Sequence, residues 1–473
     1  MRYVSTRGEA PDLGFADAML AGLARDGGLY VPDVWPHFSA TELRALRSLD
    51  YCELAIRLLT PFVGDEIAPK AFEQIVREAY ATFRHPAVCP LVQTGHGEFV
   101  LELFHGPTLA FKDVAMQLLA RLMDHVLAER GRRATIVGAT SGDTGGAAVE
   151  AFAGRDRTDI FVLFPHGRVS AVQQRQMTTS REKNVHALAI HGTFDDCQGL
   201  LKDMFNDHGF RDGIALSGVN SINWARIMAQ IVYYFSSALA LGAPDRAVSF
   251  TVPTGNFGDI FAGYAAKRMG LPVERLVIAT NENDILARAL ATGEYRTGAV
   301  VATTSPSMDI QVSSNFERLL FEASGRSAET VRRYMGGLKQ SGAFTIDAGP
   351  LQRIREDFDA ARATAAQAAE AISSMLSGSG YLIDPHTAAA VHVARDTTPS
   401  GAPMVVLATA HPAKFPDAVR DACGVTPDLP SWLAGMMRRK EAFTELPSDL
   451  KMVEDHISGR ARAAAEGDQT AWT

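Results

Sequence analysis

From about residue 98 onward, short apolar and β-branched runs alternate with longer stretches of helical periodicity. Near-continuous apolar runs of this length are typical of strands in a parallel sheet that is covered on both faces. The stretches between them are long enough for helical crossovers, so the alternation predicts a doubly wound, mostly parallel α/β fold. The runs are ATIVGAT (134–140), DIFVLF (159–164), VHALAI (185–190), VSFTVPT (248–254), RLVIAT (275–280) and MVVLATA (404–410).

The two ends of the chain have a different texture. LGFADAMLAGLA (13–24) and ATELRALRSLDYCELAIRLLTPFV (40–63) place apolar residues at helical spacing. The stretch HPAVCPLVQTGHG (85–97) interrupts this pattern with prolines and glycines and marks a boundary. We therefore expect a mainly helical N-terminal domain (1–92), an α/β core (93–430) and a C-terminal helical tail (431–473).

Composition narrows the class of protein. The chain has 473 residues, of which 47% are hydrophobic and 21% charged, so it is neither disordered nor collagen-like. The net charge of −8 argues against a large nucleic-acid surface. No signal peptide and no apolar run of about 18 residues is evident, so no membrane span is expected. The four cysteines lie far apart without a CxxC pair, which predicts reduced thiols in a cytoplasmic protein and no metal site.

The segment GATSGDTGGAAVEAF (138–152) joins a predicted strand to a predicted helix through a turn at residues 141–145. Glycines let the backbone approach a ligand, and a helix N-terminus offers free N–H groups and a positive dipole end. The turn therefore predicts a site for a carboxylate or phosphate. It matches neither G-x-G-x-x-G nor the Walker lysine motif, which argues against a dinucleotide or nucleoside triphosphate. A helix start capped by Ser, Asp and Thr explains the pattern equally well.

The segment PTGNFGDIFAGYAAKRMG (253–270) repeats this arrangement after another strand. Residues 255–258 can present successive N–H groups to a phosphate, ahead of a helix that begins near Asp259. The Asp259 carboxylate would repel that phosphate unless its side chain turns back to cap its own helix. A tight turn is again the alternative. Two such loops at the ends of different strands favour a ligand with two anionic ends, bound at the carboxyl edge of the sheet.

Lys112 lies in FHGPTLAFKDVAMQLLARL (104–122), between Phe111 and the start of an apolar helix. Burial and the positive end of a helix both lower the pKa of an amine and favour its neutral form. A neutral amine is the nucleophile that Schiff-base chemistry requires. The alternative, which is the commoner one for an isolated FKD triplet, is a surface lysine paired with Asp113.

Several further motifs accompany these loops and the lysine. In chain order the set is FHGPTLAFKD, SGDTGGAA, NSINWARI (220–227), PTGNFGD, SPSMDIQVSSNFERL (305–319) and ATAHPAKFP (408–416). Taken together, these motifs resemble those of the threonine synthase family, in the family's order from residue 3 to at least residue 416, and YVSTRG and RDGGLYVP are similar to the opening of the family's longer members. The resemblance implies a pyridoxal 5'-phosphate enzyme of the tryptophan-synthase-β-like fold (fold type II), with the cofactor between two lobes.

The resemblance also implies roles around the cofactor. Lys112 matches the lysine that holds the cofactor as a Schiff base, and Thr409 matches the hydroxyl residue near the pyridine nitrogen. The residues that match the loop around the cofactor phosphate are Gly255, Asn256, Phe257, Gly258 and Asp259.

Further roles are implied for the substrate. Asn223 and Arg226, placed at the substrate phosphate, are three residues apart on a helix that Ser221 could cap, so they can face one pocket. Arginine suits a bidentate phosphate contact, although an ordinary ion pair on the helix is an equal alternative for Arg226. Many relatives in the wider superfamily have Asn where this chain has Asp143. The residues that match the segment around the substrate carboxylate are Ser141, Gly142, Asp143 and Thr144.

The reaction implied is the last step of threonine biosynthesis, in which O-phospho-L-homoserine and water give L-threonine and phosphate by γ-elimination and β-addition of water. Such a carbon–oxygen lyase needs a small-molecule substrate and no nucleic acid, membrane or obligatory protein partner. A threonine or serine dehydratase, or a β-replacing synthase of the same fold, would keep the lysine and both loops but needs no pocket for a substrate phosphate. A cofactor-binding protein without synthase activity, and a chain that uses both loops as plain helix caps, are further alternatives.

Overall fold

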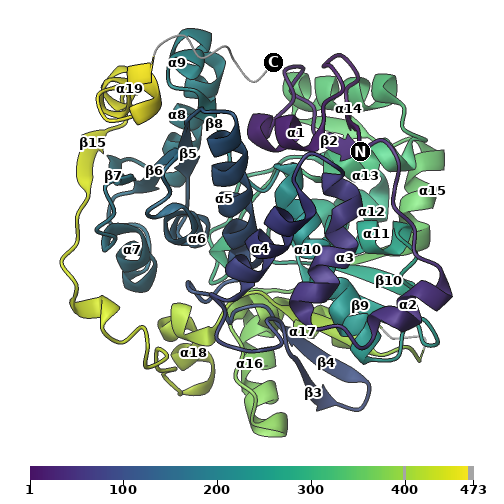
Figure 1. Ribbon diagram of the computed structural model, residues 1–473. Coiled ribbons are helices and arrows are strands. Elements are labelled where there is room, and N and C mark those ends of the chain that lie inside the picture. Colours follow the sequence, from purple (N-terminus) through teal and green to yellow (C-terminus); the bar gives the residue numbers. More distant parts are fainter. Residues whose placement is uncertain (398–400, 467–473) are drawn as a thin grey trace.

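Two sheets, one in each of two lobes, organise the α/β part of the chain (Figure 1). The computed structural model describes residues 1–397 and 401–466. The larger sheet has the strand order β13-β10-β9-β14-β4-β3, and all of its pairs are parallel except β3–β4. Its strands are β3 (Leu91–Gly95), β4 (Glu98–Glu102), β9 (Val248–Pro253), β10 (Val273–Thr280), β13 (Phe358–Arg362) and β14 (Met404–Ala408).

The smaller sheet has the order β15-β7-β6-β5-β8, and every pair in it is parallel. Its strands are β5 (Ala134–Ala139), β6 (Thr158–Pro165), β7 (Val185–His191), β8 (Leu216–Ser217) and β15 (Thr444–Pro447). All six predicted runs are strands, namely β5, β6, β7, β9, β10 and β14. The predicted α/β class with mostly parallel sheets is therefore confirmed.

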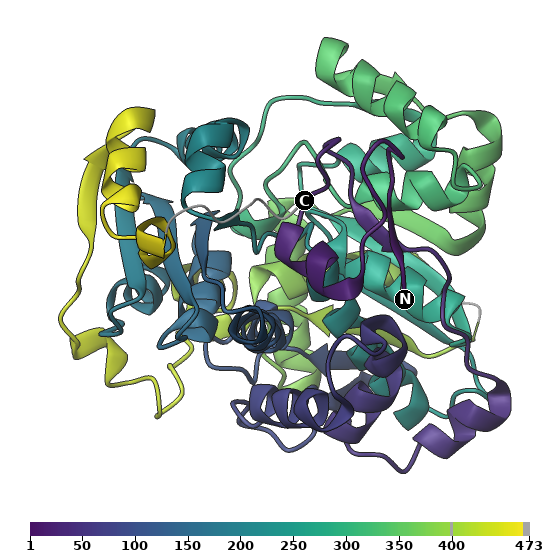
Figure 2. The same cartoon turned by 45° about the horizontal axis from the view of Figure 1, so that its top comes forward.

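Helix α5 (Lys112–Glu129) lies between the lobes (Figure 2). It packs against α6 of the smaller lobe and α10 of the larger one, so most of its residues are buried. The helices around the smaller sheet are α6 (Asp143–Phe152), α7 (Ala171–Thr178), α8 (Phe194–Asn206), α9 (His208–Gly213) and α19 (Leu450–Ser458). Those of the larger lobe are α10 (Trp224–Ala240), α11 (Gly258–Arg268), α12 (Ile285–Thr292), α13 (Phe316–Ala323), α14 (Ala328–Ser341), α15 (Ala348–Asp357), α16 (Ala365–Ser379), α17 (Pro385–Asp396) and α18 (Pro416–Cys423).

Short elements complete the loops. The strands β11 (Glu294–Arg296) and β12 (Ala343–Thr345) pair antiparallel in a two-stranded sheet apart from the two main sheets. The 3-10 turns are η1 (Pro306–Met308), η2 (Pro412–Lys414), η3 (Met436–Arg438) and η4 (Arg462–Glu466).

The N-terminal region is mainly helical, as predicted, and also contains an antiparallel two-stranded ladder. Ser39 and Asp50 each form a capping box, which divides the predicted helical stretch 40–63 into two helices. The region shares its hydrophobic core with α10, because the Trp224 ring lies 5.9 Å from that of Tyr3 and 5.7 Å from that of Phe62. The division of the chain at residue 92 therefore stays a prediction. The elements are β1 (Tyr3–Ser5), α1 (Phe15–Ala21), β2 (Tyr30–Pro32), α2 (Ala40–Leu46), α3 (Tyr51–Val63) and α4 (Pro69–Tyr80).

The C-terminal segment differs from the helical tail expected for 431–473. Strand β15 adds to the edge of the smaller sheet, with Glu445 paired to Ala189, before the chain forms α19. A four-residue strand that contains a proline has no readable periodicity, and an edge is where a sheet tolerates proline. Residues 467–473, which belong to the expected tail, lie outside the described residues. Among the helices described, none is long and apolar enough to cross a bilayer.

Candidate active site

A cavity of about 690 Å³ lies between the two lobes, at the carboxyl ends of β5, β9 and β14. This is the edge at which the two predicted loops were expected to meet a ligand. The N-terminal region adds residues 21–23 to the wall, so it helps to cover the site. The predicted site residues that line the cavity are Lys112, Ser141, Thr144, Arg226, Gly255, Asn256, Phe257, Gly258, Asp259 and Thr409, whereas Gly142, Asp143 and Asn223 do not line it.

Lys112 is the first residue of α5, and its side chain is buried in the wall of this cavity. Its Nζ donates to the Ser307 hydroxyl at 3.3 Å and lies 3.5 Å from the Asp143 carboxylate. Burial lowers the pKa of Lys112, the Asp143 charge opposes that shift, and the positive charges of Lys414 and Arg226 add to it. The net effect favours the neutral amine that a Schiff base requires.

The pairing of Lys112 with Asp113 at the surface, considered above, is wrong. Asp113 is itself buried, and its carboxylate accepts hydrogen bonds from the Thr108 N–H at 2.8 Å and from the Thr108 hydroxyl at 2.7 Å. The start of α5 is instead tied to the end of β14, because the Phe111 N–H donates to the Thr409 carbonyl at 2.8 Å. This contact brings Lys112 and the side chain of Thr409 into the wall of the same cavity.

Asp143 was expected at the substrate carboxylate, and the structure uses it differently. Its Oδ1 lies 2.7 Å from Nζ of the buried Lys414 and accepts a hydrogen bond from Gln173 at 3.0 Å. Burial acts to raise the pKa of Asp143, but the charges of Lys414 and Lys112 hold it well below its usual range. An ionised Asp143 would repel a substrate carboxylate. Its place is between the two lysines, outside the cavity wall.

The turn before α6 is closed by the side chain of Thr140. The hydroxyl of Thr140 accepts hydrogen bonds from the N–H groups of Gly142 and Gly145, both at 2.9 Å. The predicted caps are therefore wrong, because Thr140 caps this turn and the N-cap residue Gly142 has no side chain to do so. The remaining first-turn N–H groups have no partner within the helix, and Ser141 and Thr144 line the cavity beside them.

The second loop, residues 255–258, forms a tight turn that packs closely against the segment around Ser307. Phe257 is left-handed with φ of 64° and is the N-cap of α11, which begins at Gly258, one residue before the predicted start. A Cβ on Gly255 would lie 2.6 Å from the Ser307 carbonyl oxygen, so the two segments approach as closely as glycine permits. Gly258 and Asp259, the first residues of α11, line the cavity, and a phosphate nest at their N–H groups stays a prediction.

The side chain of Asp259 neither caps its helix nor carries a full repulsive charge toward a phosphate. Its Oδ1 accepts hydrogen bonds from the hydroxyls of Tyr233 and Tyr234 on α10. Burial raises the pKa of Asp259 to about 7, although the two tyrosine hydroxyls act to lower it. The expected repulsion between the Asp259 carboxylate and a phosphate is therefore reduced by partial protonation of Asp259 rather than by helix capping.

Arg226 is buried and faces the cavity without a compensating charge. One Nη donates to the Val219 carbonyl at 3.2 Å, and Nε has no hydrogen-bond partner. No carboxylate of the described residues pairs with it, so the helix ion pair considered above is wrong. The equally buried Arg318 differs, because its donors reach the carbonyls of Tyr30 and Ile222. A buried guanidinium left open at a cavity indicates a site for an anion.

Asn223 was placed with Arg226 at a phosphate, and the structure shows it as a helix cap instead. It is fully buried, and its side-chain oxygen accepts from the Ala225 N–H at 3.0 Å. Its amide group donates to the carbonyls of Met19 at 2.8 Å and Gly218 at 3.2 Å. Asn223, and not Ser221, is therefore the N-cap of α10, and its polar atoms are committed to the fold.

Known families match almost the whole chain. The model "Threonine synthase N terminus" matches residues 2–80, "Pyridoxal-phosphate dependent enzyme" matches 90–410, and "Threonine synthase, C-terminal" matches 387–457. The chain belongs to the threonine synthase family.

Individual members of the family are similar over their full length. The threonine synthase of Pseudomonas aeruginosa is 54% identical over 460 residues, which cover 97% of this chain and 98% of that protein. The crystal structure of PLP-bound threonine synthase from Brucella melitensis has a TM-score of 0.96 and 69% identity and covers 98% of this chain and 100% of that one. The threonine synthase structure from yeast has a TM-score of 0.91 and 38% identity, with 98% and 99% covered.

Membership in this family of pyridoxal-phosphate-dependent enzymes brings its cofactor, and the residues of the cavity fit that cofactor. Lys112 supplies a desolvated amine, and the loop 255–258, which lines the cavity, would supply backbone N–H groups to the cofactor phosphate. Thr409 offers a neutral hydroxyl in the same cavity.

We expect Gly255→Asp to weaken retention of pyridoxal phosphate at least tenfold. The new side chain meets the Ser307 carbonyl at its first atom and adds a negative charge near the phosphate. Like charges roughly 4 Å apart repel by about 1–4 kcal/mol at a partly solvated site, and about 1.4 kcal/mol is tenfold. Absorbance after dialysis measures retention. Gly378→Asp is the control, since nothing lies within 4 Å of a Cβ there. Equal retention in both variants would mean that the loop is a plain helix cap.

Sequence reasoning missed several residues next to Lys112. Lys414 is fully buried and lies against Asp143, and Ser307 lies between Lys112 and His386. Both belong to motifs that the family resemblance included without a role. The run DPHT (384–387) is a helix-start pattern, with Asp384 as N-cap and proline next, but the pattern says nothing of a contact between His386 and a serine 79 residues away.

Proposed function

We propose that this member of the threonine synthase family converts O-phospho-L-homoserine and water into L-threonine and phosphate. The observation that carries the proposal is the open, buried Arg226 guanidinium in the wall of the cavity that also contains Lys112. A dehydratase or a β-replacing synthase acts on a substrate without a γ-phosphate and therefore needs no cationic side chain to bind a substrate phosphate. The family match over nearly the whole chain supports the same reaction.

Each part of this substrate has a partner in the cavity. Pyridoxal phosphate supplies the electron sink for carbanion chemistry when bound. We assign the neutral amine of Lys112 as the base for the Cα proton, because burial favours its uncharged form. We place the substrate carboxylate at Ser141, Thr144 and the N-terminus of α6, and the γ-phosphate at Arg226. Thr409, which lines the cavity, would offer a hydroxyl to the pyridine nitrogen without the charge that would hold that nitrogen protonated.

The test of this proposal is phosphate release from O-phospho-L-homoserine by the purified holoenzyme, with L-threonine identified as the product. Faster turnover of L-serine or L-threonine than of the phosphorylated substrate would establish the dehydratase alternative. A fully loaded protein that turns over none of these substrates would be a cofactor-binding protein. The reaction uses small soluble metabolites, and the four cysteines are free thiols, so we place the protein in the cytoplasm.

The buried pair of Asp384 and His386 holds the Ser307 segment against Lys112. Nδ1 of His386 lies 2.6 Å from Asp384, and its Nε2 accepts the backbone N–H of Ser307 at 3.2 Å. A backbone N–H only donates, so Nε2 is unprotonated and Nδ1 carries the proton. The Ser307 hydroxyl in turn accepts from Lys112. We therefore assign His386 as a positioning residue for the Lys112 amine.

We expect His386→Leu to lower kcat by about tenfold to a hundredfold with little change in KM, because a shift near 1 Å at a reacting group costs roughly that much. His386→Gln should recover much of the loss, since its amide oxygen can accept the Ser307 N–H. Steady-state kinetics of both variants at saturating cofactor measure the effect. If the two variants have equal kcat, the contact with Ser307 does not position Lys112, and the pair only caps α17.

A further inference from the structure

A cluster of three side chains of types that bind metals lies on the smaller sheet, and none of its members lines the cavity. His166 directly follows β6, His191 is the last residue of β7, and Glu445 is in β15. Pro165 pairs with Ile190, so the two histidines lie side by side at the ends of neighbouring strands. Glu445 pairs with Ala189, two residues before His191 and therefore on the same face of β7. Three adjacent parallel strands thus each bring one such side chain to the same edge of the sheet.

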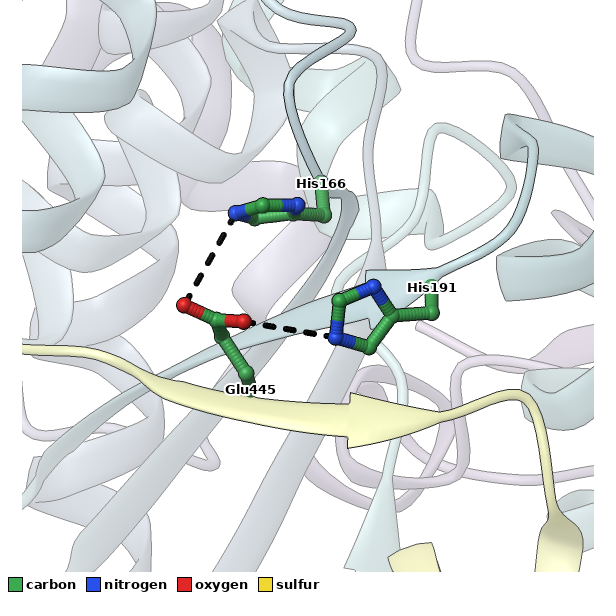
Figure 3. A group of neighbouring side chains, drawn as sticks. All are labelled: His166, His191 and Glu445. Carbon is green, nitrogen blue, oxygen red and sulfur yellow. Dashed lines mark ion pairs between the residues drawn. The ribbon is translucent and has the colours of Figure 1, made fainter.

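The side chains converge through the atoms that ligate metals (Figure 3). Nε2 of His191 lies 3.3 Å from one oxygen of Glu445, and Nε2 of His166 lies 3.8 Å from the other. The ligand atoms of all three residues lie within 4.8 Å of one another. Ligands about 2.0–2.1 Å from a tetrahedral Zn²⁺ are roughly 3.3–3.4 Å apart, so only small side-chain rotations separate this arrangement from a coordinated one.

The local charges leave Glu445 available to a cation. Among the described residues, its only ion-pairing partners are the two histidines, and neither Lys nor Arg neutralises it. The side chains of His166, His191 and Glu445 are 42%, 54% and 50% exposed, so an ion from solvent and its water ligands have access. Two imidazole nitrogens and one carboxylate form a donor set that suits Zn²⁺ and other divalent transition metals better than Mg²⁺ or Ca²⁺.

We propose that His166, His191 and Glu445 bind one divalent transition-metal ion of the Zn²⁺ type, with water in the remaining positions. The ion links the C-terminal strand β15 to β7 and to the end of β6. Strand β15 lies at the sheet edge and pairs with β7 over only four residues, so this link adds a second attachment for the C-terminal segment. The proposal does not depend on the reaction catalysed in the cavity.

The test uses the holoenzyme after chelator treatment and dialysis, with Zn²⁺ alone as the probe in calorimetric titrations. We expect one equivalent to bind to the unmodified chain, with affinity at least tenfold weaker in both E445Q and H191Q. The control variant H208Q changes a histidine that is exposed and lies outside the cluster, and it should bind like the unmodified chain. Zn²⁺ should also raise the unfolding temperature of the unmodified chain and of H208Q more than that of E445Q, because an ion that binds only the folded state stabilises it.

Turnover and circular dichroism check that the variants fold, since none of the three residues lines the cavity. The proposal is overturned if Zn²⁺ fails to bind at one equivalent. It is equally overturned if E445Q and H191Q bind as tightly as H208Q, because the ion would then be held by other groups.

Discussion

Lys112→Ala is expected to keep the fold and lose both the covalent cofactor chromophore and nearly all turnover. The side chain is buried at the start of α5, and burial lowers its pKa in the direction that favours the neutral amine a Schiff base requires. Loss of a positioned base alone lowers a rate by about 10²–10⁴-fold. The losses of covalent attachment and of base catalysis therefore act together. Visible spectra and phosphate release from O-phospho-L-homoserine measure the two effects.

Borohydride reduction followed by peptide mapping identifies the modified lysine. The label should be on Lys112, and not on Lys414, which is ion-paired with Asp143 at 2.7 Å, or on Lys202, which is exposed at the cavity wall. Lys202→Ala is the matched control and should keep the chromophore. A label on Lys414 or Lys202, or a chromophore that survives in Lys112→Ala, would show that Lys112 does not hold the cofactor.

Arg226→Ala is expected to lower kcat/KM for O-phospho-L-homoserine by at least an order of magnitude. Truncating one partner of a buried charged pair costs about 2–5 kcal/mol, and about 1.4 kcal/mol is tenfold. Because Arg226 has no carboxylate partner among the described residues, its removal leaves no protein charge unpaired. The loss therefore reports contact with an anionic ligand, and steady-state kinetics measure it.

Two controls separate the meanings of a loss at Arg226. Any slow turnover of L-serine or L-threonine should change little, because neither substrate carries a phosphate. Retention of pyridoxal phosphate, measured in the same variant, should also be preserved. A weaker cofactor affinity would place Arg226 at the cofactor phosphate, and equal losses for all substrates would mean that it supports the fold. Either result would contradict the proposed pocket for the substrate phosphate.

The sequence by itself determined the parts of this protein that depend on local patterns. Apolar runs predicted six of the strands in the two main sheets, and glycine-containing turns after two of them marked both loops at the cavity. The setting of Lys112 between Phe111 and an apolar helix indicated its burial. These features were readable because strand burial, turn geometry and the charge state at a helix start follow from residues within a few positions of one another.

Only the tertiary structure decided which partner each polar side chain meets. Asn223 caps α10 and contacts the Met19 carbonyl 204 residues away, Asp143 lies between Lys112 and Lys414, and His386 reaches Ser307. The same holds for β15, whose four residues form a strand because β7 offers an open edge. A buried polar group must find a hydrogen bond or a counter-charge, but any of several distant segments can supply it. Which segment supplies the partner depends on the tertiary packing, and it cannot be predicted from the spacing of residues along the chain.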